Sequence, residues 1–250
     1  MKRHKDYFVK SLFSKKALMA FGVITISMLL TSNPAYTLLI DRGGGLIYDS
    51  VLNITWLQDA NYAATSGYLH SPGGRLGWNS ALIWADNLTY YDPIRDIVWD
   101  DWRLPHAFPV NASNYNYNRS VDGSTDIGLN ISAQDSAFPG STASEMAYMY
   151  YNNLGNSAYA EWGLNTGPFI NLQRFFYWSN TEHLYDDVAC FFGFWDGYQY
   201  YSRKDDNLLY MWAVRDGDVG APVPEPSTIL LVGTSLFSMF AFGREKLFQK

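Results

Sequence analysis

Cysteine is nearly absent from this 250-residue chain, which contains only Cys190. A disulfide within the chain is therefore excluded, because it needs two thiols. The surrounding sequence, VACFFGFW, is apolar, so we expect a core cysteine. Histidine is also scarce. Beyond the first residues, His70, His106 and His183 lack any short metal-ligand spacing, so the sequence predicts no zinc site.

Basic residues are few and unevenly placed. The chain has 18 Lys and Arg against 24 Asp and Glu. Nine basic and three acidic residues lie in residues 1–37 and 223–250, which leaves 9 basic and 21 acidic residues in 38–222, a net charge of −12. Such a surface repels nucleic acid, whose binding needs clustered Lys and Arg. It is compatible with neutral sugars, cations or basic partners.

Catalytic signatures are missing from the sequence. There is no nucleophile elbow, phosphate loop or HExxH metal motif. A glycoside hydrolase needs two carboxylates about 5 to 10 Å apart, and Asp100, Asp101, Glu161 and Glu182 are available for this role. Because acidic residues are abundant, their availability alone indicates little. We expect a noncatalytic protein, with a carbohydrate-processing enzyme that uses an unrecognised carboxylate pair as the alternative.

Long apolar runs occur at the two ends of the chain. At the start, six basic residues precede the fourteen-residue run ALMAFGVITISMLL, which is followed by small residues at Ala35 and Thr37. This order of positive, apolar and small residues is typical of a secretory signal peptide. An uncleaved anchor would need a longer run of about 20 residues. We therefore predict a signal peptide over residues 1–37, removed near its end.

At the other end, a Pro-Glu-Pro motif precedes an apolar run and a basic terminus. Residues 228–243 carry no charge and would reach roughly 24 Å as a helix. The segment 223–250 resembles the PEP-CTERM sorting signal of Gram-negative bacteria. The resemblance implies export, transient retention in the inner membrane through a transmembrane segment, recognition by an exosortase, and release to the cell surface or extracellular matrix. A buried helix and a plain C-terminal anchor are the rivals. The motif residues are Val223, Pro224, Glu225 and Pro226.

Residues 38–222 have the length of one domain. In its first part, β-rich runs at 46–48 and 54–57 flank a turn-prone stretch and predict a hairpin. A helix follows, with Asn79 or Ser80 as the expected N-cap and apolar residues at helical spacing up to Leu88. A second helix is predicted by a Thr142 and Glu145 capping box, with Gly155 at its C-terminus. Its core stripe is Met146, Met149 and Tyr150.

The last part of the domain is rich in strands. Asp196-Gly197 lies between two aromatic runs and predicts a hairpin with a two-residue turn. The stretch NLLYMWAVRDGD predicts one further strand that ends at Asp216-Gly217. We expect the first hairpin to pack near this strand. Residues 107–141 are rich in Asn, Ser, Gly and Asp and form either an ordered loop region or a mobile excursion.

Four segments carry a second resemblance: ITWLQDANYA, DWRLP, YWSNTE and WAVRDGD, which begin at residues 54, 101, 177 and 212. They resemble the Lcl-like C-terminal domain family. The resemblance implies an α+β fold, a variant of the C-type-lectin-like or formylglycine-generating-enzyme-like fold, with two helices and small antiparallel sheets. Some relatives adhere to glycans, and the enzymatic relatives use a cysteine or copper-bound pair that Cys190 alone cannot supply. We expect Trp102, Trp178 and Trp212 to be buried and Arg103 and Arg215 to pair with carboxylates.

Aromatic residues are the abundant class, with 9 Trp, 19 Tyr and 15 Phe. Exposed aromatic rings beside Asp and Asn suit sugar rings, so we predict a ligand site at Trp195, Asp196 and Tyr198 for a neutral glycan or exopolysaccharide. No cofactor is predicted except a weak calcium hypothesis, since calcium prefers oxygen ligands and a solvated acidic turn is the rival. The calcium candidates are Asp205, Asp206, Asp216 and Asp218.

Overall fold

The computed structural model describes residues 39–68, 72–159, 163–205 and 207–220. The predicted signal peptide and the predicted sorting segment with its transmembrane run lie outside these residues. Within the described part of the chain, no helix is long and apolar enough to cross a membrane. The described residues belong to a single compact unit and form a mixed, β-rich fold, with short helices and three sheets.

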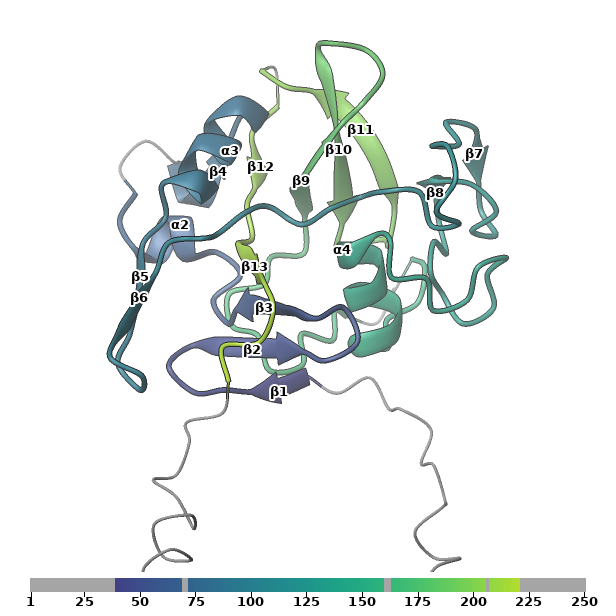
Figure 1. Ribbon diagram of the computed structural model, residues 1–250. Coiled ribbons are helices and arrows are strands. Elements are labelled where there is room, and N and C mark those ends of the chain that lie inside the picture. The colour runs from purple at the N-terminus through teal and green to yellow at the C-terminus, as the bar shows by residue number, and fades with distance from the viewer. Residues whose placement is uncertain (1–38, 69–71, 160–162, 206, 221–250) are drawn as a thin grey trace, which may run out of the picture. The chain divides into compact units, whose positions relative to one another are not determined.

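The first sheet joins the two ends of the described chain. Its order is β1-β2-β3-β13 and all its pairs are antiparallel. Figure 1 shows the C-terminal strand β13 entering beside the three N-terminal strands. The predicted first hairpin and its packing near the last strand are both confirmed, with Trp56 opposite Val214. The strands are β1 (Leu39–Asp41), β2 (Leu46–Asp49), β3 (Ile54–Leu57) and β13 (Val214–Asp216).

The same turn closes two hairpins. Tyr48–Asn53 (YDSVLN) joins β2 to β3, and Tyr91–Asp96 (YDPIRD) joins β5 (Tyr90–Asp92) to β6 (Ile97–Trp99). In each, the aspartate accepts hydrogen bonds from the backbone N–H groups two and three residues later. The tyrosine hydroxyl donates to the side chain of the last residue at 2.9 Å, and that residue has a φ of 54°. Local hydrogen bonding of Asp therefore shapes both turns.

The largest sheet has the order β4-β12-β9-β10-β11-β8-β7. The pairs β12–β9 and β7–β8 are parallel, and the other pairs in this sheet are antiparallel. The expectation of small antiparallel sheets is therefore wrong here, because this sheet is mixed and has seven strands. Its strands are β4 (Arg75–Leu76), β7 (Arg119–Ser120), β8 (Ile127–Gly128), β9 (Phe176–Glu182), β10 (Val188–Gly193), β11 (Gln199–Arg203) and β12 (Leu209–Tyr210).

The single strand predicted for NLLYMWAVRDGD is wrong, since the chain divides it between two sheets. β12 belongs to the large sheet and β13 to the first sheet. The connecting residues Met211, Trp212 and Ala213 are buried and leave the strand geometry as the chain crosses between the sheets. The predicted end of the segment is confirmed, because β13 ends at Asp216 and Gly217 has a φ of 77°.

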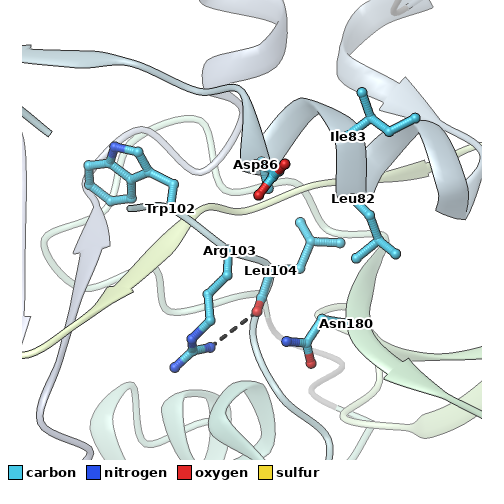
Figure 2. A pocket seen from close by; sticks show the side chains of 8 residues that line it. Leu82, Ile83, Asp86, Trp102, Arg103, Leu104 and Asn180 are labelled. Atoms are coloured by element: carbon cyan, nitrogen blue, oxygen red, sulfur yellow. Dashed lines mark hydrogen bonds between the residues drawn. The ribbon is translucent and has the colours of Figure 1, made fainter. Parts of the chain in front are cut away.

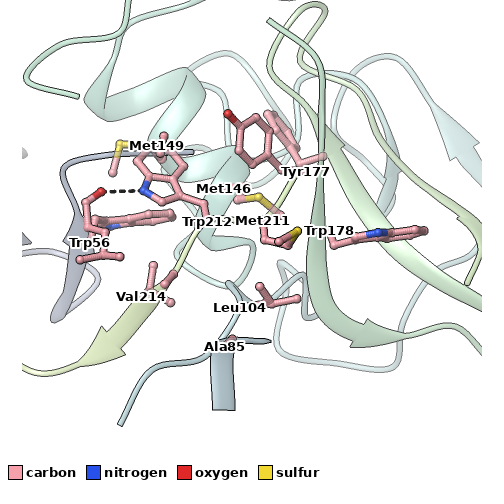
Figure 3. Packing of buried hydrophobic residues seen from close by; sticks show 14 of the residues in the cluster. Trp56, Ala85, Leu104, Met146, Met149, Tyr177, Trp178, Met211, Trp212 and Val214 are labelled. Atoms are coloured by element: carbon pink, nitrogen blue, oxygen red, sulfur yellow. Dashed lines mark hydrogen bonds between the residues drawn. The ribbon is translucent and has the colours of Figure 1, made fainter. Parts of the chain in front are cut away.

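Large aromatic side chains fill the core between the sheets, as Figure 3 shows. The ring centroid of Trp212 lies 4.5 Å from that of Trp56 and 4.7 Å from that of Phe169. The indole Nε1 of Trp212 donates a hydrogen bond of 2.7 Å to the carbonyl of Leu57. The predicted burial of the three motif tryptophans is confirmed for Trp102, Trp178 and Trp212.

The first predicted helix exists as α3 (Trp78–Asp86), but its expected N-cap is wrong. The cap is Gly77, two residues before Asn79 and three before Ser80. Tertiary contacts explain the shift, because the backbone N–H of Trp78 donates to the carbonyl of Lys204 and its indole N–H donates to that of Ser179. The remaining short elements are α2 (Tyr62–Thr65) and the 3₁₀ turn η1 (Pro72–Gly74).

The second predicted helix exists as α4 (Glu145–Tyr148), which continues as the π-helical turn η2 (Met149–Asn153). Its core stripe is confirmed, because Met146, Met149 and Tyr150 are fully buried. The capping box is wrong, because the N-cap is Ser144 and it makes no capping hydrogen bond with its side chain. Its hydroxyl donates instead to the Gln199 side chain.

The predicted β10–β11 hairpin is confirmed, although its two-residue turn is wrong. The loop covers residues 194–198, and within it Gly197 has a positive φ of 78° while Asp196 does not. Phe194 is fully buried against Trp212, which lengthens the loop. Residues 107–141 form the ordered alternative, since they include β7, β8 and the buried side chains of Ile127 and Ile131.

Candidate functional site

A row of partly exposed aromatic side chains crosses one end of the large sheet, and we name it the aromatic band. Its members come from β9, β10, β11, β12 and the adjoining loops. Phe175 is 37% exposed and Trp195 49% exposed, and the other members are half-buried. The band consists of Phe175, Phe176, Phe191, Trp195, Tyr198, Tyr200 and Tyr210.

The rings of the aromatic band form a continuous chain of contacts. From Tyr210 the chain runs through Phe175 and Phe176 to Phe191, with centroid separations of 5.9, 5.0 and 4.9 Å. It continues through Tyr200 to Tyr198, with separations of 6.3 and 5.3 Å. Trp195 joins it from the β10–β11 loop, 6.4 Å from Phe176. These separations fall in the range of edge-to-face and offset aromatic pairs.

Strand alternation places the side chains of Phe191 and Tyr200 outside the core. In β10, Phe191 is half-buried, whereas its neighbours Cys190 and Phe192 are fully buried. Phe191 lies opposite Tyr200 of β11, so both side chains share one face of the sheet. The opposite face carries Tyr177 and Phe192 of the core, and Tyr210 belongs to that face because it pairs with Tyr177. Phe191 and Tyr200 therefore lie on one face of the sheet, and the β12 end of the band lies on the other.

Arginine side chains lie over the rings at both ends of the band. The guanidinium of Arg75 is 5.8 Å from the ring centroid of Phe175 and 5.9 Å from that of Tyr210. The guanidinium of Arg119 is 5.1 Å from the ring of Tyr198. All three distances allow cation–π attraction. The flat guanidinium groups therefore help to fix the orientation of the terminal rings.

The structure brings together the three predicted ligand residues but orients them differently. Trp195 and Tyr198 belong to the aromatic band. Asp196 is 9% exposed, and its Oδ1 accepts a hydrogen bond of 3.0 Å from the backbone N–H of Tyr198. Burial raises the pKa of Asp196. Asp196 therefore shapes the loop, while the aromatic rings provide the contact surface.

The sequence prediction missed five members of the band. Phe191 and Tyr200 could have been found from the period-two alternation of β10 and β11. Phe175, Phe176 and Tyr210 could not, because their position depends on the parallel pairing of β9 with β12, which are distant in sequence.

Two of the carboxylates considered for glycoside hydrolysis, Asp101 and Glu182, have basic partners. Asp101 accepts hydrogen bonds of 2.7 and 2.8 Å from Arg215, and this arginine lowers the pKa of Asp101. Glu182 pairs with Lys204. Asp100 is exposed, and Glu161 lies outside the described residues. The predicted role of Arg215 as a charge partner is confirmed.

The calcium candidates are not brought together. Asp216 pairs with Arg103 at 2.6 Å and Asp218 with Arg42 at 2.5 Å. Asp205 is exposed after β11, and Asp206 is outside the described residues. Across the described ranges, no group of three or more His, Cys, Asp or Glu side chains is placed to hold a metal ion.

The lone cysteine is a core residue, as predicted. Cys190 is fully buried, and its Sγ lies 3.4 Å from the hydroxyl of Tyr115. Burial raises the pKa of the Cys190 thiol to about 11. A thiol of this kind stays protonated and unreactive at neutral pH. His106 and His183 lie on different segments, and His70 is outside the described residues.

Comparisons of the chain with protein families, curated proteins and solved structures found no match. Function is therefore inferred from the aromatic band and from the sequence patterns at the two ends of the chain.

Proposed function

We propose that this chain is an exported, noncatalytic glycan-binding protein of the cell surface or extracellular matrix, and that the aromatic band is its binding surface. The observation that carries the proposal is the unbroken chain of contacts between partly exposed rings from Tyr210 to Tyr198. Contiguous exposed aromatic surface is characteristic of binding sites.

The shape of the band favours an extended ligand. Neighbouring strands of a sheet are about 4.8 Å apart, so the three strands β9, β10 and β11 place the rings of Phe176, Phe191 and Tyr200 over roughly 10 Å. Sugar rings have apolar faces that stack on aromatic side chains and hydroxyl edges that need polar neighbours. An oligosaccharide covers this surface better than a monosaccharide.

Charge favours a neutral glycan. Residues 38–222 contain 9 basic and 21 acidic residues, a net charge of −12. Several of the basic residues pair with carboxylates inside the fold, including Arg42, Arg95, Arg103 and Arg215. Polyanions such as heparin-like chains and nucleic acids are repelled by such a surface. A neutral exopolysaccharide is compatible with it.

The terminal patterns support the proposed route. The chain is exported through its signal peptide, held briefly in the inner membrane by residues 228–243, and processed by an exosortase at Val223–Pro226. Within this proposal the domain is a variant of the C-type-lectin-like fold, as the resemblance to the Lcl-like family implies. The short helices and the antiparallel four-stranded and two-stranded sheets support that assignment.

The test is a glycan array with the full-length chain and three variants. Tyr200→Ala and Trp195→Ala each remove one ring of the band, and we expect each to weaken glycan binding by about three- to tenfold, the worth of one aromatic contact. Tyr91→Ala removes an exposed ring on the β5–β6 hairpin and serves as the matched control.

Equal loss in all three variants would show that the band is not the site. Tight, salt-sensitive binding to heparin would contradict the preference for neutral glycans. A turnover assay on the sugars that bind separates binding from catalysis, because cleavage of the bound sugar would favour the enzymatic alternative.

A further inference from the structure

A separate pocket of about 300 Å³ lies between α3, the segment 102–104 and β9. Figure 2 shows its residues: Leu82, Ile83 and Asp86 come from α3, and Asn180 comes from β9. The lining combines an apolar surface with three polar side chains. Its residues are Leu82, Ile83, Ala85, Asp86, Trp102, Arg103, Leu104 and Asn180.

The positive charge in this pocket is already neutralised. The Nε and Nη2 groups of Arg103 donate to Asp216 at 3.1 and 2.6 Å. Its Nη1 and Nη2 groups donate to Glu145 at 2.8 and 2.7 Å, and Nη1 also donates to the carbonyl of Leu104 at 3.1 Å. All five N–H groups of the guanidinium therefore have acceptors. Arg103 has no donor left for an anionic ligand.

The negative charge in the pocket is not neutralised. Within the part of the chain that the structure describes, no Lys, Arg or His forms an ion pair with Asp86. Asp86 is also the last residue of α3, where the unpaired carbonyl groups give the helix end a partial negative charge. Figure 2 shows its carboxylate directed toward the side of the pocket formed by the segment Trp102–Leu104. The pocket therefore attracts a cation.

A hydrogen-bond donor faces the same space. The Oδ1 atom of Asn180 lies 2.6 Å from Nδ1 of His106, so the amide group is held in one orientation. Its Nδ2 makes no hydrogen bond within the described ranges and lines the pocket. An acceptor such as a backbone carbonyl fits there. Leu104 and Ala85 are buried in the floor, and Ile83 is 58% exposed at the rim.

We propose that this pocket binds the Lys or Arg side chain of a basic segment of a partner protein. The cationic head pairs with Asp86, the alkyl stem lies on Leu82 and Leu104, and the backbone carbonyl of the segment accepts from Asn180. Long basic side chains bury their stems on apolar surface in this way. The net charge of −12 over residues 38–222 steers a basic partner toward the domain.

Other ligand classes fit the pocket less well. An anion meets no unpaired cation, because Arg103 is saturated. A sugar ring needs an exposed aromatic face, and Trp102 is 4% exposed. The volume is at the lower end of ligand pockets and matches one side chain.

The test uses the full-length chain labelled with ¹⁵N at tryptophan and two peptides, acetyl-Leu-Lys-Leu-amide and the same peptide with Nε-acetyl-lysine. We expect the Lys peptide to shift the indole N–H signal of Trp102, which lines the pocket, and the acetylated peptide to bind more weakly. Asp86→Asn should reduce affinity for the Lys peptide by about fivefold, the worth of one partly exposed ion pair. Asp135→Asn removes an exposed acid on a different segment and should leave it unchanged.

Equal binding of the two peptides, or unchanged affinity in Asp86→Asn, would overturn the proposal. So would an equal loss in Asp135→Asn, since net charge alone would then explain binding. The melting temperature of each variant shows that the fold is retained. Glycan binding by Asp86→Asn should match that of the unmodified chain, so this test is independent of the aromatic band.

Discussion

Asp49 and Asp92 occupy the same position in two identical turns but differ in charge environment. Both side chains are fully buried. Asp49 has no cationic partner among the described residues and contacts Asn153, and burial raises its pKa. Burial also acts to raise the pKa of Asp92, but hydrogen bonds from Arg95 and Trp99 outweigh it and lower the pKa. In the β2–β3 turn, burial therefore destabilises the charged form of Asp49. In the β5–β6 turn, the hydrogen bonds stabilise the charged form of Asp92.

Asp49→Asn should keep the turn and increase stability near neutral pH. A raised folded-state pKa means that Asp49 favours folding most below about pH 4, the usual pKa of Asp, and that this contribution is lost as pH rises through the folded-state pKa. Nδ2 of Asn153 now donates to Oδ2 of Asp49, so the new amide can donate to Oδ1 of Asn153 once the Asn153 amide turns over. Asp49→Ala should cost about 1 to 3 kcal/mol, because Val51 and Leu52 lose their acceptor.

Urea denaturation at several pH values measures both effects. Asp92→Asn is the matched control, and we expect it to lower the stability near neutral pH. The lowered pKa of Asp92 means that this carboxylate contributes stability above about pH 4, which is lost as pH falls. A decrease in stability of Asp49→Asn at pH 7 as large as that of Asp49→Ala would contradict the expectation.

Arg103 connects three elements that are far apart in the sequence. Its side chain pairs with Glu145 at the start of α4 and with Asp216 at the end of β13. Its backbone exchanges two hydrogen bonds with Val214, which attaches the DWRLP segment to β13. Glu145 also accepts from the backbone N–H of His106. The predicted pairing of Arg103 with carboxylates is confirmed.

Glu145→Ala should destabilise the fold by about 3 to 5 kcal/mol, because it leaves the guanidinium of Arg103, 21% exposed, without its more buried partner. The double variant Arg103→Met with Glu145→Leu should recover part of this loss, since it removes both charges together. Thermal unfolding of the two proteins measures the difference. If the double variant were as unstable as Glu145→Ala, packing and not charge would explain the effect.

The elements that the sequence predicted well are those set by local chemistry. The β2–β3 and β10–β11 hairpins and the core faces of α3 and α4 follow from patterns within about fifteen residues. The helix starts were wrong for a tertiary reason: Trp78 is held by Ser179 and Lys204, and Glu145 is taken by Arg103 instead of capping its own helix. Side chains that serve distant segments cannot be assigned from local spacing.

On the scale of the whole molecule, the sequence located part of the candidate site but not its extent. Trp195 and Tyr198 lie in the β10–β11 loop, which the Asp196-Gly197 pair predicted. The other half of the aromatic band depends on β12 lying parallel to β9, and β12 was hidden within a longer predicted strand. The pairing of distant strands is decided by burial of residues such as Met211 and Trp212, which fill the space between two sheets.

The proposed sorting of the whole chain predicts a defined product. If an exosortase acts at the Pro-Glu-Pro motif, mature protein should lack residues 228–250. Intact-mass measurement of native protein, from cells with and without the enzyme, tests this. Glu225→Ala changes the motif and should leave residues 228–250 attached. Glu245→Ala is the control, because Glu245 lies beyond the apolar run, and this variant should still lose the tail. Mature protein that retains the tail in normal cells would instead indicate a permanent anchor.

The pairing of β3 with β13 also sets the order in which the domain can form. The two strands are separated by about 160 residues, so the first sheet stays incomplete until nearly the whole domain has been synthesised. Asp216, the last residue of β13, lies 12 residues before Thr228. During synthesis the early part of the chain would therefore remain unfolded, which is the form in which a polypeptide passes through a narrow secretion channel. Under the proposed export route, this strand order would delay completion of the first sheet until translocation is almost complete.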